Sequence, residues 1–483
     1  MRALLFERNV ARFAAARMAA LAGPGLGARP GPLRLTDLDS PALPGPGWHR
    51  IKPVLSGICG SDLALLDGHT SRYFEPLVSF PFVPGHEVVG VVESGPRKGE
   101  RVVVEPLLSC AVRGIDPPCR PCASGHTGCC ENTAFGQIKP GPQTGYCAST
   151  GGGWSTSLVA NDIQLHPVPS PFSNEDAVMI EPTSCAVHAG LSALSVLCAG
   201  YDQGSLQTRS SMAKAPLIVI LGAGTLGLCT VAALSYALKS WLFTSDVATS
   251  TTMTDPRETH AGKTSATDPA TEAPSTSAGE LATDVVLMSV AKHPVQKRFA
   301  AELGASVVVE PGELRRAVRR FTGSLALPAN PRRNPDRLTA GADVVVDCVG
   351  SASSLEESFS VVRPGGSVVL LGMPGKLHID LTALWHREIR LVGAYAYGLE
   401  TLPGAAGARR KTFDLATELV KEKGLGRLVS AKYPIERYEE AVHHAATAGR
   451  RGAVKVVFDL EPASYGLKSL RQSPRSVRQG ERP

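Results

Sequence analysis

Side chains that commonly bind zinc recur in the N-terminal part of the chain. The thiol of Cys59 comes two residues before the hydroxyl of Ser61, and an imidazole and a carboxylate follow at His86 and Glu87. Thiolate and imidazole are ligands that zinc prefers, and a catalytic zinc site uses about three protein ligands and one open position. We predict that Cys59, His86 and Glu181, a carboxylate after an apolar segment, hold such a zinc.

Zinc at such a site acts as a Lewis acid. It lowers the pKa of a bound alcohol, so that the alkoxide forms near neutral pH and a hydride can leave the carbon. A lone cysteine or histidine is more often only a packed side chain, so this prediction depends on the combination of residues.

A second set of cysteines stands at short spacings: Cys110, Cys119, Cys122 and Cys130. Closed structural zinc sites use four thiolates at such spacings. Cys129 could replace Cys130, and Asp116 could replace Cys110. The alternative is a group of free thiols without metal.

A glycine-spaced turn, Gly222-Ala223-Gly224-Thr225-Leu226-Gly227, follows the apolar run Leu217–Leu221 and precedes a helical stretch. Glycines allow a tight turn and let a pyrophosphate approach the helix N-terminus, where free N–H groups favour anions. Gly222, Gly224, Thr225, Leu226 and Gly227 are therefore predicted to bind a dinucleotide.

Together these motifs resemble those of the zinc-containing medium-chain alcohol, polyol and threonine dehydrogenases, over nearly the whole chain. In that family the first ligand is a Cys two residues before a Ser or Thr, and the second is the His of a Gly-His-Glu triplet. The third is a Cys, Asp or Glu. Cys59, His86 and Glu181 take these positions, and the resemblance makes Glu87 a neighbour of the zinc or an exchanging ligand.

The resemblance also assigns roles around the zinc. Asp62 would orient the ring of His86, and Ser61 would pass the alcohol proton outward. Some relatives continue this relay with a histidine five residues after the first ligand, but that position is Ala64 here. In the cysteine lobe of similar dehydrogenases the first ligand falls on Asp116, so Cys110 is expected to act as the displaced fourth ligand.

The choice of cofactor depends on the end of the second strand, where NAD enzymes carry an acid that binds the ribose. Asp246 stands about 20 residues after the glycine turn, the usual spacing for this acid. It begins a low-complexity segment, however, and we predict that Asp284–Val290 is the true second strand. By the resemblance the position of the acid is then Ala291, followed by Lys292 and His293. A missing acid and basic neighbours favour the 2′-phosphate of NADP over NAD. The alternative is that Lys292 and His293 form a solvated turn.

Three more residues are assigned to the cofactor by resemblance. Lys455 matches a basic position that touches the phosphates, and Gly350 and Gly372 end later strands near the nicotinamide.

The elements that position these residues fall into two patterns. Up to about Val159, short apolar runs alternate with Gly and Pro, which predicts a β-rich barrel domain. From Leu217 onward strands alternate with helices, which predicts a doubly wound parallel sheet. By resemblance the fold is α/β, with a GroES-like catalytic domain at 1–184 and 393–462, a zinc lobe at 110–130, and a Rossmann domain at 185–392. We predict a disordered insert at about 243–280, a similar but shorter segment at Ser324–Thr339, and a disordered basic tail at 463–483.

Composition limits the remaining classes. The chain has 483 residues, 11 cysteines, 19% charged residues and a net charge of +6 without a basic cluster that would indicate nucleic acid. Sparse cysteines favour a reducing compartment, and we expect a cytoplasmic protein. Leu217–Leu238 is uncharged, but it reads as a buried strand and helix rather than a membrane span. We expect a homodimer or homotetramer.

The predicted function is hydride transfer between an alcohol or polyol carbon and NAD(P), with a catalytic zinc, a structural zinc and a small alcohol or carbonyl substrate. One alternative is a threonine or amino-alcohol dehydrogenase of the same fold. The other is a non-catalytic protein that binds zinc and nucleotide.

Overall fold

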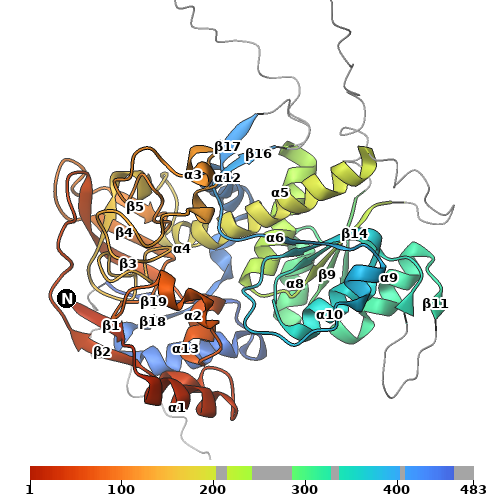
Figure 1. Cartoon of the computed structure of the whole chain (residues 1–483), viewed down its shortest axis with the longest axis horizontal. Coiled ribbons are helices and arrows are strands. Elements are labelled where there is room, and N and C mark those ends of the chain that lie inside the picture. Colours follow the sequence, from red (N-terminus) through yellow and green to blue (C-terminus); the bar gives the residue numbers. More distant parts are fainter. Residues whose placement is uncertain (203–214, 242–284, 328–336, 403–407, 462–483) are drawn as a thin grey trace, which may run out of the picture.

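The computed structural model of the chain describes residues 1–202, 215–241, 285–327, 337–402 and 408–461. The predicted insert at 243–280, which includes Asp246, and the predicted tail at 463–483 lie outside these residues. Figure 1 shows two sheet-containing lobes side by side, with the long helix α5 lying along both.

The first sheet has six parallel strands in the order β10-β9-β8-β13-β14-β15. Their bounds are β8 Leu217–Leu221, β9 Val286–Val290, β10 Val307–Val309, β13 Ala342–Asp347, β14 Val362–Leu370 and β15 Arg390–Gly393. All five residues of β8 are buried, as expected for a strand covered on both faces. The strands predicted after Leu217 are therefore confirmed, and β9 is the neighbour of β8, where the second strand was predicted.

Helices cover this sheet and join it to the other lobe. They are α4 Asn174–Val178, α5 Ile180–Asp202, α6 Thr225–Tyr236, α8 Pro294–Leu303, α9 Leu314–Thr322, α10 Ala352–Val361, α11 Thr382–His386 and α12 Thr412–Lys423. Helix α5 packs against α6 and α12 and also touches β13 and β14. Apolar residues on the two faces of the sheet form two core clusters, one with α5, α6, α8 and α12 and the other with α9 and α10.

The second sheet has seven strands in the order β18-β19-β3-β4-β5-β7, with β6 paired to β3. Their bounds are β3 Trp48–Gly57, β4 Val88–Val92, β5 Arg101–Val104, β6 Leu158–Asn161, β7 Leu165–Pro167, β18 Val429–Pro434 and β19 Lys455–Asp459. All pairs except β18 with β19 are antiparallel. The C-terminal strand β19 thus completes a sheet that the N-terminal part of the chain begins, and it does not belong to the parallel sheet.

Short elements surround this sheet. They are β1 Arg2–Phe6, α1 Val10–Ala20, β2 Leu33–Asp37, α2 Gly60–Leu66, α3 Arg120–Ala123, β16 Leu399–Thr401, β17 Arg409–Lys411 and α13 Tyr438–Ala446. Helix α1, between the paired strands β1 and β2, was not predicted. Its N-cap is Asn9, whose side chain accepts a hydrogen bond from the backbone N–H of Arg12.

One expectation is changed by the structure. The described ends of the segment Ser324–Thr339 pair as the antiparallel strands β11 Ala326–Leu327 and β12 Arg337–Leu338, so that segment is not wholly irregular.

Within the described residues, Ile180–Gly200 of α5 is long and apolar enough to cross a membrane, and 61% of that window is buried inside the protein. As predicted, Leu217–Leu238 contains a strand, β8, and a helix, α6.

Candidate active site

Cys59 and His86 meet because β3 and β4 are neighbouring antiparallel strands. Ser56 in β3 faces Val88 in β4, so the residues after β3 lie beside those before β4. The backbone N–H of Gly57 donates to the carbonyl of Glu87 over 2.9 Å. The ligand atoms of Cys59, His86 and Glu87 all lie within 4.8 Å of one another.

Asp62 contacts both Cys59 and His86. Cys59 is the N-cap of α2, and its backbone N–H donates to Oδ2 of Asp62 over 2.9 Å. Oδ1 of Asp62 lies 3.7 Å from Nδ1 of His86, and both residues are buried. Burial lowers the pKa of His86, but the Asp62 carboxylate and the Cys59 thiol outweigh it, so the pKa stands well above its usual value. Asp62 therefore lies where an orienting partner of the imidazole was predicted.

Lys455 joins the same site from the C-terminal strand. Strand β19 pairs with β3 on the side away from β4, with Val457 opposite Gly57. The ammonium of Lys455 forms a buried ion pair with Glu87 and donates to the carbonyl of Ile58 over 3.2 Å. Burial alone lowers the pKa of Lys455, but Glu87 raises it above its ordinary value. A Cβ on Gly57 would collide with the Glu87 carboxylate, so glycine is required for this close approach.

Glu181 lies near this group but outside the tight cluster. It is the second residue of α5, and its Oε1 accepts a hydrogen bond from the hydroxyl of Tyr397 over 3.2 Å. Burial raises the pKa of Glu181 to about 7, even though the positive charge of His86 opposes that rise. The carboxylate inside the 4.8 Å cluster is therefore Glu87, and Glu181 is not among the members of that cluster.

These residues fit a zinc ion. The donor set of one thiol, one imidazole and one carboxylate is the kind that zinc takes. Nδ1 of His86 and Oδ1 of Asp62 are buried without a hydrogen-bond partner. Because buried polar atoms normally have a partner, their lack of one is consistent with a site arranged around a cation.

Ser61 faces a tyrosine that the sequence reasoning missed. Ser61 lies close enough to Tyr146 to lower the pKa of its hydroxyl, and the ring of Tyr146 lies 6.1 Å from that of His86 between ring centres. Burial raises the pKa of Tyr146 well above its ordinary value. No spacing signal marks Tyr146, because it reaches the site on a long loop between β5 and β6.

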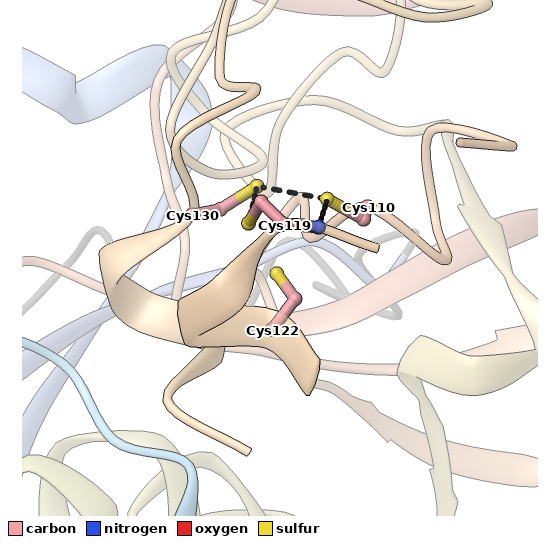
Figure 2. A group of neighbouring side chains, drawn as sticks. All are labelled: Cys110, Cys119, Cys122 and Cys130. Carbon is pink, nitrogen blue, oxygen red and sulfur yellow. Dashed lines mark hydrogen bonds between the residues drawn. The ribbon is translucent and has the colours of Figure 1, made fainter. Parts of the chain in front are cut away.

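The four predicted lobe cysteines converge. Cys110, Cys119, Cys122 and Cys130 bring their sulfur atoms within 4.8 Å of one another (Figure 2). The Sγ atoms of Cys110 and Cys130 are 3.6 Å apart, whereas Cys129 is exposed. This arrangement matches a closed tetrathiolate site.

Hydrogen bonds favour negative charge on one of these sulfurs, that of Cys110, whereas burial raises the pKa of Cys122 and raises that of Cys130 to about 11. The backbone N–H of Cys119 and the side-chain amide of Asn132 donate to Sγ of Cys110 over 3.3 and 3.2 Å. Burial raises the pKa of Cys110, but these bonds outweigh it and lower the pKa to about 7. These hydrogen bonds thus make the thiolate of Cys110 easier to form than that of an ordinary cysteine.

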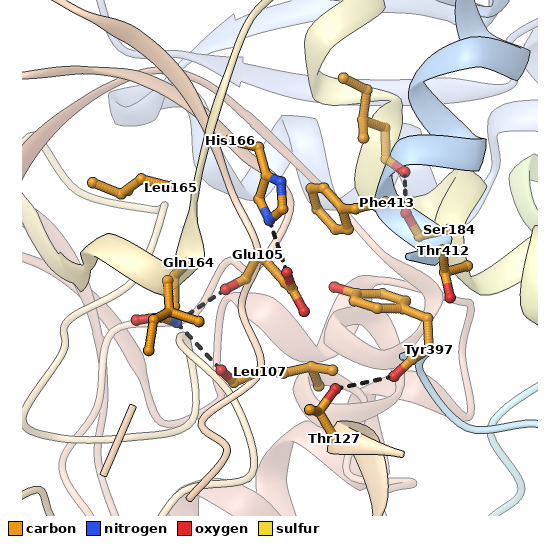
Figure 3. A network of polar contacts seen from close by, with 12 residues as sticks. Glu105, Leu107, Thr127, Gln164, Leu165, His166, Ser184, Tyr397, Thr412 and Phe413 are labelled. Carbon is orange, nitrogen blue, oxygen red and sulfur yellow. Dashed lines mark hydrogen bonds and ion pairs between the residues drawn. The ribbon is translucent and has the colours of Figure 1, made fainter. Parts of the chain in front are cut away.

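A polar network links the outer side of the site to the strands. Figure 3 shows Tyr397 beside Phe413, and His166 on the other side of that ring. Nε2 of His166 lies 2.8 Å from the carboxylate of Glu105, and the hydroxyl of Thr127 donates to the carbonyl of Tyr397. Tyr397 donates a hydrogen bond to Glu181. Its position is therefore set by the packing of its ring and by the hydrogen bond to its backbone carbonyl.

A cavity of about 440 Å³ connects the zinc cluster with the glycine turn. Cys59, Glu87 and Lys455 lie at one end, and residues 224–227 form part of the wall. Gly222 has a φ of +95°, and a Cβ on Gly227 would collide with the carbonyl of Gly222. The predicted turn thus lies in a cavity shared with the metal cluster, as a dinucleotide site requires.

The other predicted cofactor residues lie around the carboxyl end of the parallel sheet. Ala291 follows β9 and is buried, and Lys292 and His293 line the cavity. Gly350 and Gly372 follow β13 and β14 and pack against each other so closely that a Cβ on either would collide with the other's backbone. Sequence reasoning missed Arg450, which also lines the cavity. The available signal was its basic run, Gly449-Arg450-Arg451-Gly452, just before Lys455.

Two family descriptions match the chain. "Alcohol dehydrogenase GroES-like domain" matches residues 45–170, and "Zinc-binding dehydrogenase" matches residues 281–422. Together they cover more than half of the chain.

Curated relatives and a solved structure agree with these matches. The chain is 22% identical to a probable D-xylulose reductase A of Aspergillus fumigatus, over 76% of this chain and 80% of the relative. It is 24% identical to L-idonate 5-dehydrogenase of Vitis vinifera, over 85% and 87%. An Escherichia coli alcohol dehydrogenase solved with NADH has the same fold, with a TM-score of 0.57, 18% identity and coverage of 95% and 99%. The chain belongs to the zinc-binding medium-chain dehydrogenase/reductase family and is an oxidoreductase with a GroES-like and a Rossmann fold.

Proposed function

We propose that this protein transfers a hydride between an alcohol or polyol carbon and a nicotinamide cofactor, with NADP preferred. The observation that carries the proposal is one cavity whose wall contains Cys59 and Glu87 at one end and the glycine turn and Lys292 at the other. The relatives named above act, by their names, on a sugar-derived ketone or acid, which supports a polyol-type substrate.

Within this proposal, Cys59 and His86 hold the zinc, with Glu87 or Glu181 as the third ligand. When bound, zinc supplies Lewis-acid polarisation of the substrate oxygen. The chain's own groups do the rest: Asp62 orients His86, and Lys455 neutralises Glu87. Ser61 takes the alcohol proton, and Tyr146 lies beside it. The four lobe cysteines hold a second, structural zinc.

The test joins metal analysis with a substrate screen. Purified protein is expected to contain about two zinc ions per chain and to oxidise polyols or secondary alcohols faster with NADP than with NAD. Cys59→Ser should lose about one zinc and nearly all turnover, because a catalytic ligand is removed. A Cys59→Ser variant with unchanged turnover would contradict the proposal and favour the non-catalytic alternative. Faster turnover of hydroxy-amino acids than of polyols would favour the threonine-type alternative.

A further inference from the structure

The cavity wall near β9 is built from two parts of the chain that are distant in sequence. Lys292 and His293 follow β9 of the parallel sheet, whereas Gly449 and Arg450 belong to the short 3-10 turn Ala448–Arg451, which precedes β19 of the other sheet. A Cβ on Gly449 would collide with the imidazole of His293, so the turn touches that ring directly. The absence of a side chain at Gly449 allows this approach and brings Arg450 to the cavity.

Positive charge at this end of the cavity is not neutralised by the protein. Glu87 is the only acid among the described residues that line the cavity, and Lys455 pairs with it at the opposite end. No ion pair joins Lys292 or Arg450 to a carboxylate in the described parts of the chain. Burial lowers the pKa of His293, and the charges of Lys292 and Arg450 lower it further, which shows that the three groups act on one another.

The topology of the parallel sheet indicates which part of the cofactor lies near the end of β9. In a doubly wound sheet the pyrophosphate binds at the glycine turn after the first strand, and the adenosine ribose lies at the end of the second strand. That end is Ala291, beside Lys292 and His293, where no acid would repel an anion. A cluster of unpaired cationic groups there fits a phosphate on the ribose, because charge-assisted hydrogen bonds from guanidinium to phosphate are strong and can be bidentate.

We propose that Arg450 binds the 2′-phosphate of NADP together with Lys292, so that this phosphate bridges the two lobes across the Gly449–His293 contact. The inference rests on the NADP preference proposed above and goes beyond it, because it assigns the preference to a residue outside the nucleotide-binding sheet. NAD, which lacks the phosphate, leaves Arg450 without a ligand. Recognition of NADP then requires the two lobes to stand in the arrangement seen here.

The test measures binding without turnover. Dissociation constants of 2′,5′-ADP and 5′-AMP, which differ in the 2′-phosphate, are obtained by calorimetry for wild type, Arg450→Gln and Arg451→Gln. Arg451 is the matched control, because it is exposed on the same turn, carries the same charge and does not line the cavity. Arg450→Gln is expected to raise the dissociation constant of 2′,5′-ADP about 10-fold or more, the loss typical of a hydrogen bond to a charged group. It should change the dissociation constant of 5′-AMP less than about twofold. Arg451→Gln should change neither beyond twofold.

A second variant tests the bridge itself. Gly449→Ala should push the turn away from His293 and weaken the binding of 2′,5′-ADP, while the affinity for 5′-AMP stays unchanged. Near-wild-type melting temperatures would show that both variants fold. If wild type prefers 2′,5′-ADP but Arg450→Gln keeps that preference, the role of Arg450 is wrong and the NADP proposal stands. Equal weakening of both ligands by Arg450→Gln also overturns the role. If wild type itself binds the two ligands equally, both the NADP preference and the bridge are wrong.

Discussion

The ammonium of Lys455 and the carboxylate of Glu87 form an ion pair that is almost completely shielded from solvent, with exposed side-chain fractions of 2% and 1%. Lys455 begins β19 and Glu87 directly precedes β4, the two strands that pair with β3 beside Cys59 and His86. The pair contributes to the charge of the catalytic site, because it places one cation against the carboxylate that lies within 4.8 Å of the ligand atoms of Cys59 and His86.

Removing one partner of this pair should be costly. Lys455→Met leaves the Glu87 carboxylate buried and unpaired, and we expect the free energy of unfolding to fall by about 3–5 kcal/mol. Urea denaturation measures this change. The double variant Glu87→Gln with Lys455→Met removes both charges and should recover most of the loss. Equal instability of the single and double variants would show that packing, and not charge, holds the pair.

The cysteine lobe allows a comparison of adjacent residues. Cys130→Ser removes a sulfur from the converged set, and we expect the loss of about one zinc per chain and a melting temperature lower by at least about 2–4 °C, the shift for 1 kcal/mol in a domain of this size. Cys129→Ser changes the exposed neighbour and should leave both quantities unchanged. Loss of zinc in Cys129→Ser but not in Cys130→Ser would mean that the ligand is Cys129. Metal analysis and thermal unfolding measure the two effects.

Two glycines of the nucleotide turn should respond differently to alanine. A Cβ on Gly227 would collide with the carbonyl of Gly222, so Gly227→Ala is expected to lower the melting temperature and abolish nucleotide binding. A Cβ on Gly224 meets nothing within 4 Å, and this residue lines the cavity. Gly224→Ala should therefore keep the wild-type melting temperature and weaken nucleotide binding roughly tenfold, equivalent to about 1.4 kcal/mol. Unchanged nucleotide affinity in Gly224→Ala would argue against a pyrophosphate at this turn.

A pH-dependent contribution to stability is expected where β16 meets α5. Oε1 of Glu400 lies 2.8 Å from Nδ1 of His188 and accepts a hydrogen bond from Thr412. Burial raises the pKa of Glu400, but His188 and Thr412 outweigh it, so its folded-state pKa lies below the ordinary value of 4.5. A lowered carboxyl pKa stabilises the fold above about pH 4.5, and this stabilisation is lost as the pH falls through the folded-state pKa.

We therefore expect wild type to exceed Glu400→Gln in unfolding free energy by about 1.5–3 kcal/mol at pH 6, as for hydrogen bonds to a charged group. The difference should shrink as the pH falls below about 4.5. Denaturation curves at pH 6 and pH 3.5 measure it, and Glu356→Gln on α10 is a control whose difference should stay small. A gap that stays constant with pH would show that Glu400 does not act through its charge.

Short segments of the sequence are enough to predict the local features of this protein. The zinc-binding types at Cys59 and His86, the cysteine spacing from Cys110 to Cys130, and the strand and glycine turn from Leu217 to Gly227 are encoded within short segments. Such segments can be recognised from the sequence because ligand chemistry and backbone geometry limit which residue types can occupy them. The same locality predicted the parallel sheet, because each strand is a short apolar run followed by a helix.

Tertiary structure alone decided which distant groups meet. Nothing in the spacing shows that Lys455 pairs with Glu87, because that contact depends on β19 joining β3. Nor does it show that Tyr397 holds Glu181 or that Arg450 reaches the end of β9. These contacts arise where strands and turns from separate parts of the chain pack together, and their pairing is set by long-range burial and sheet register, which no local pattern records.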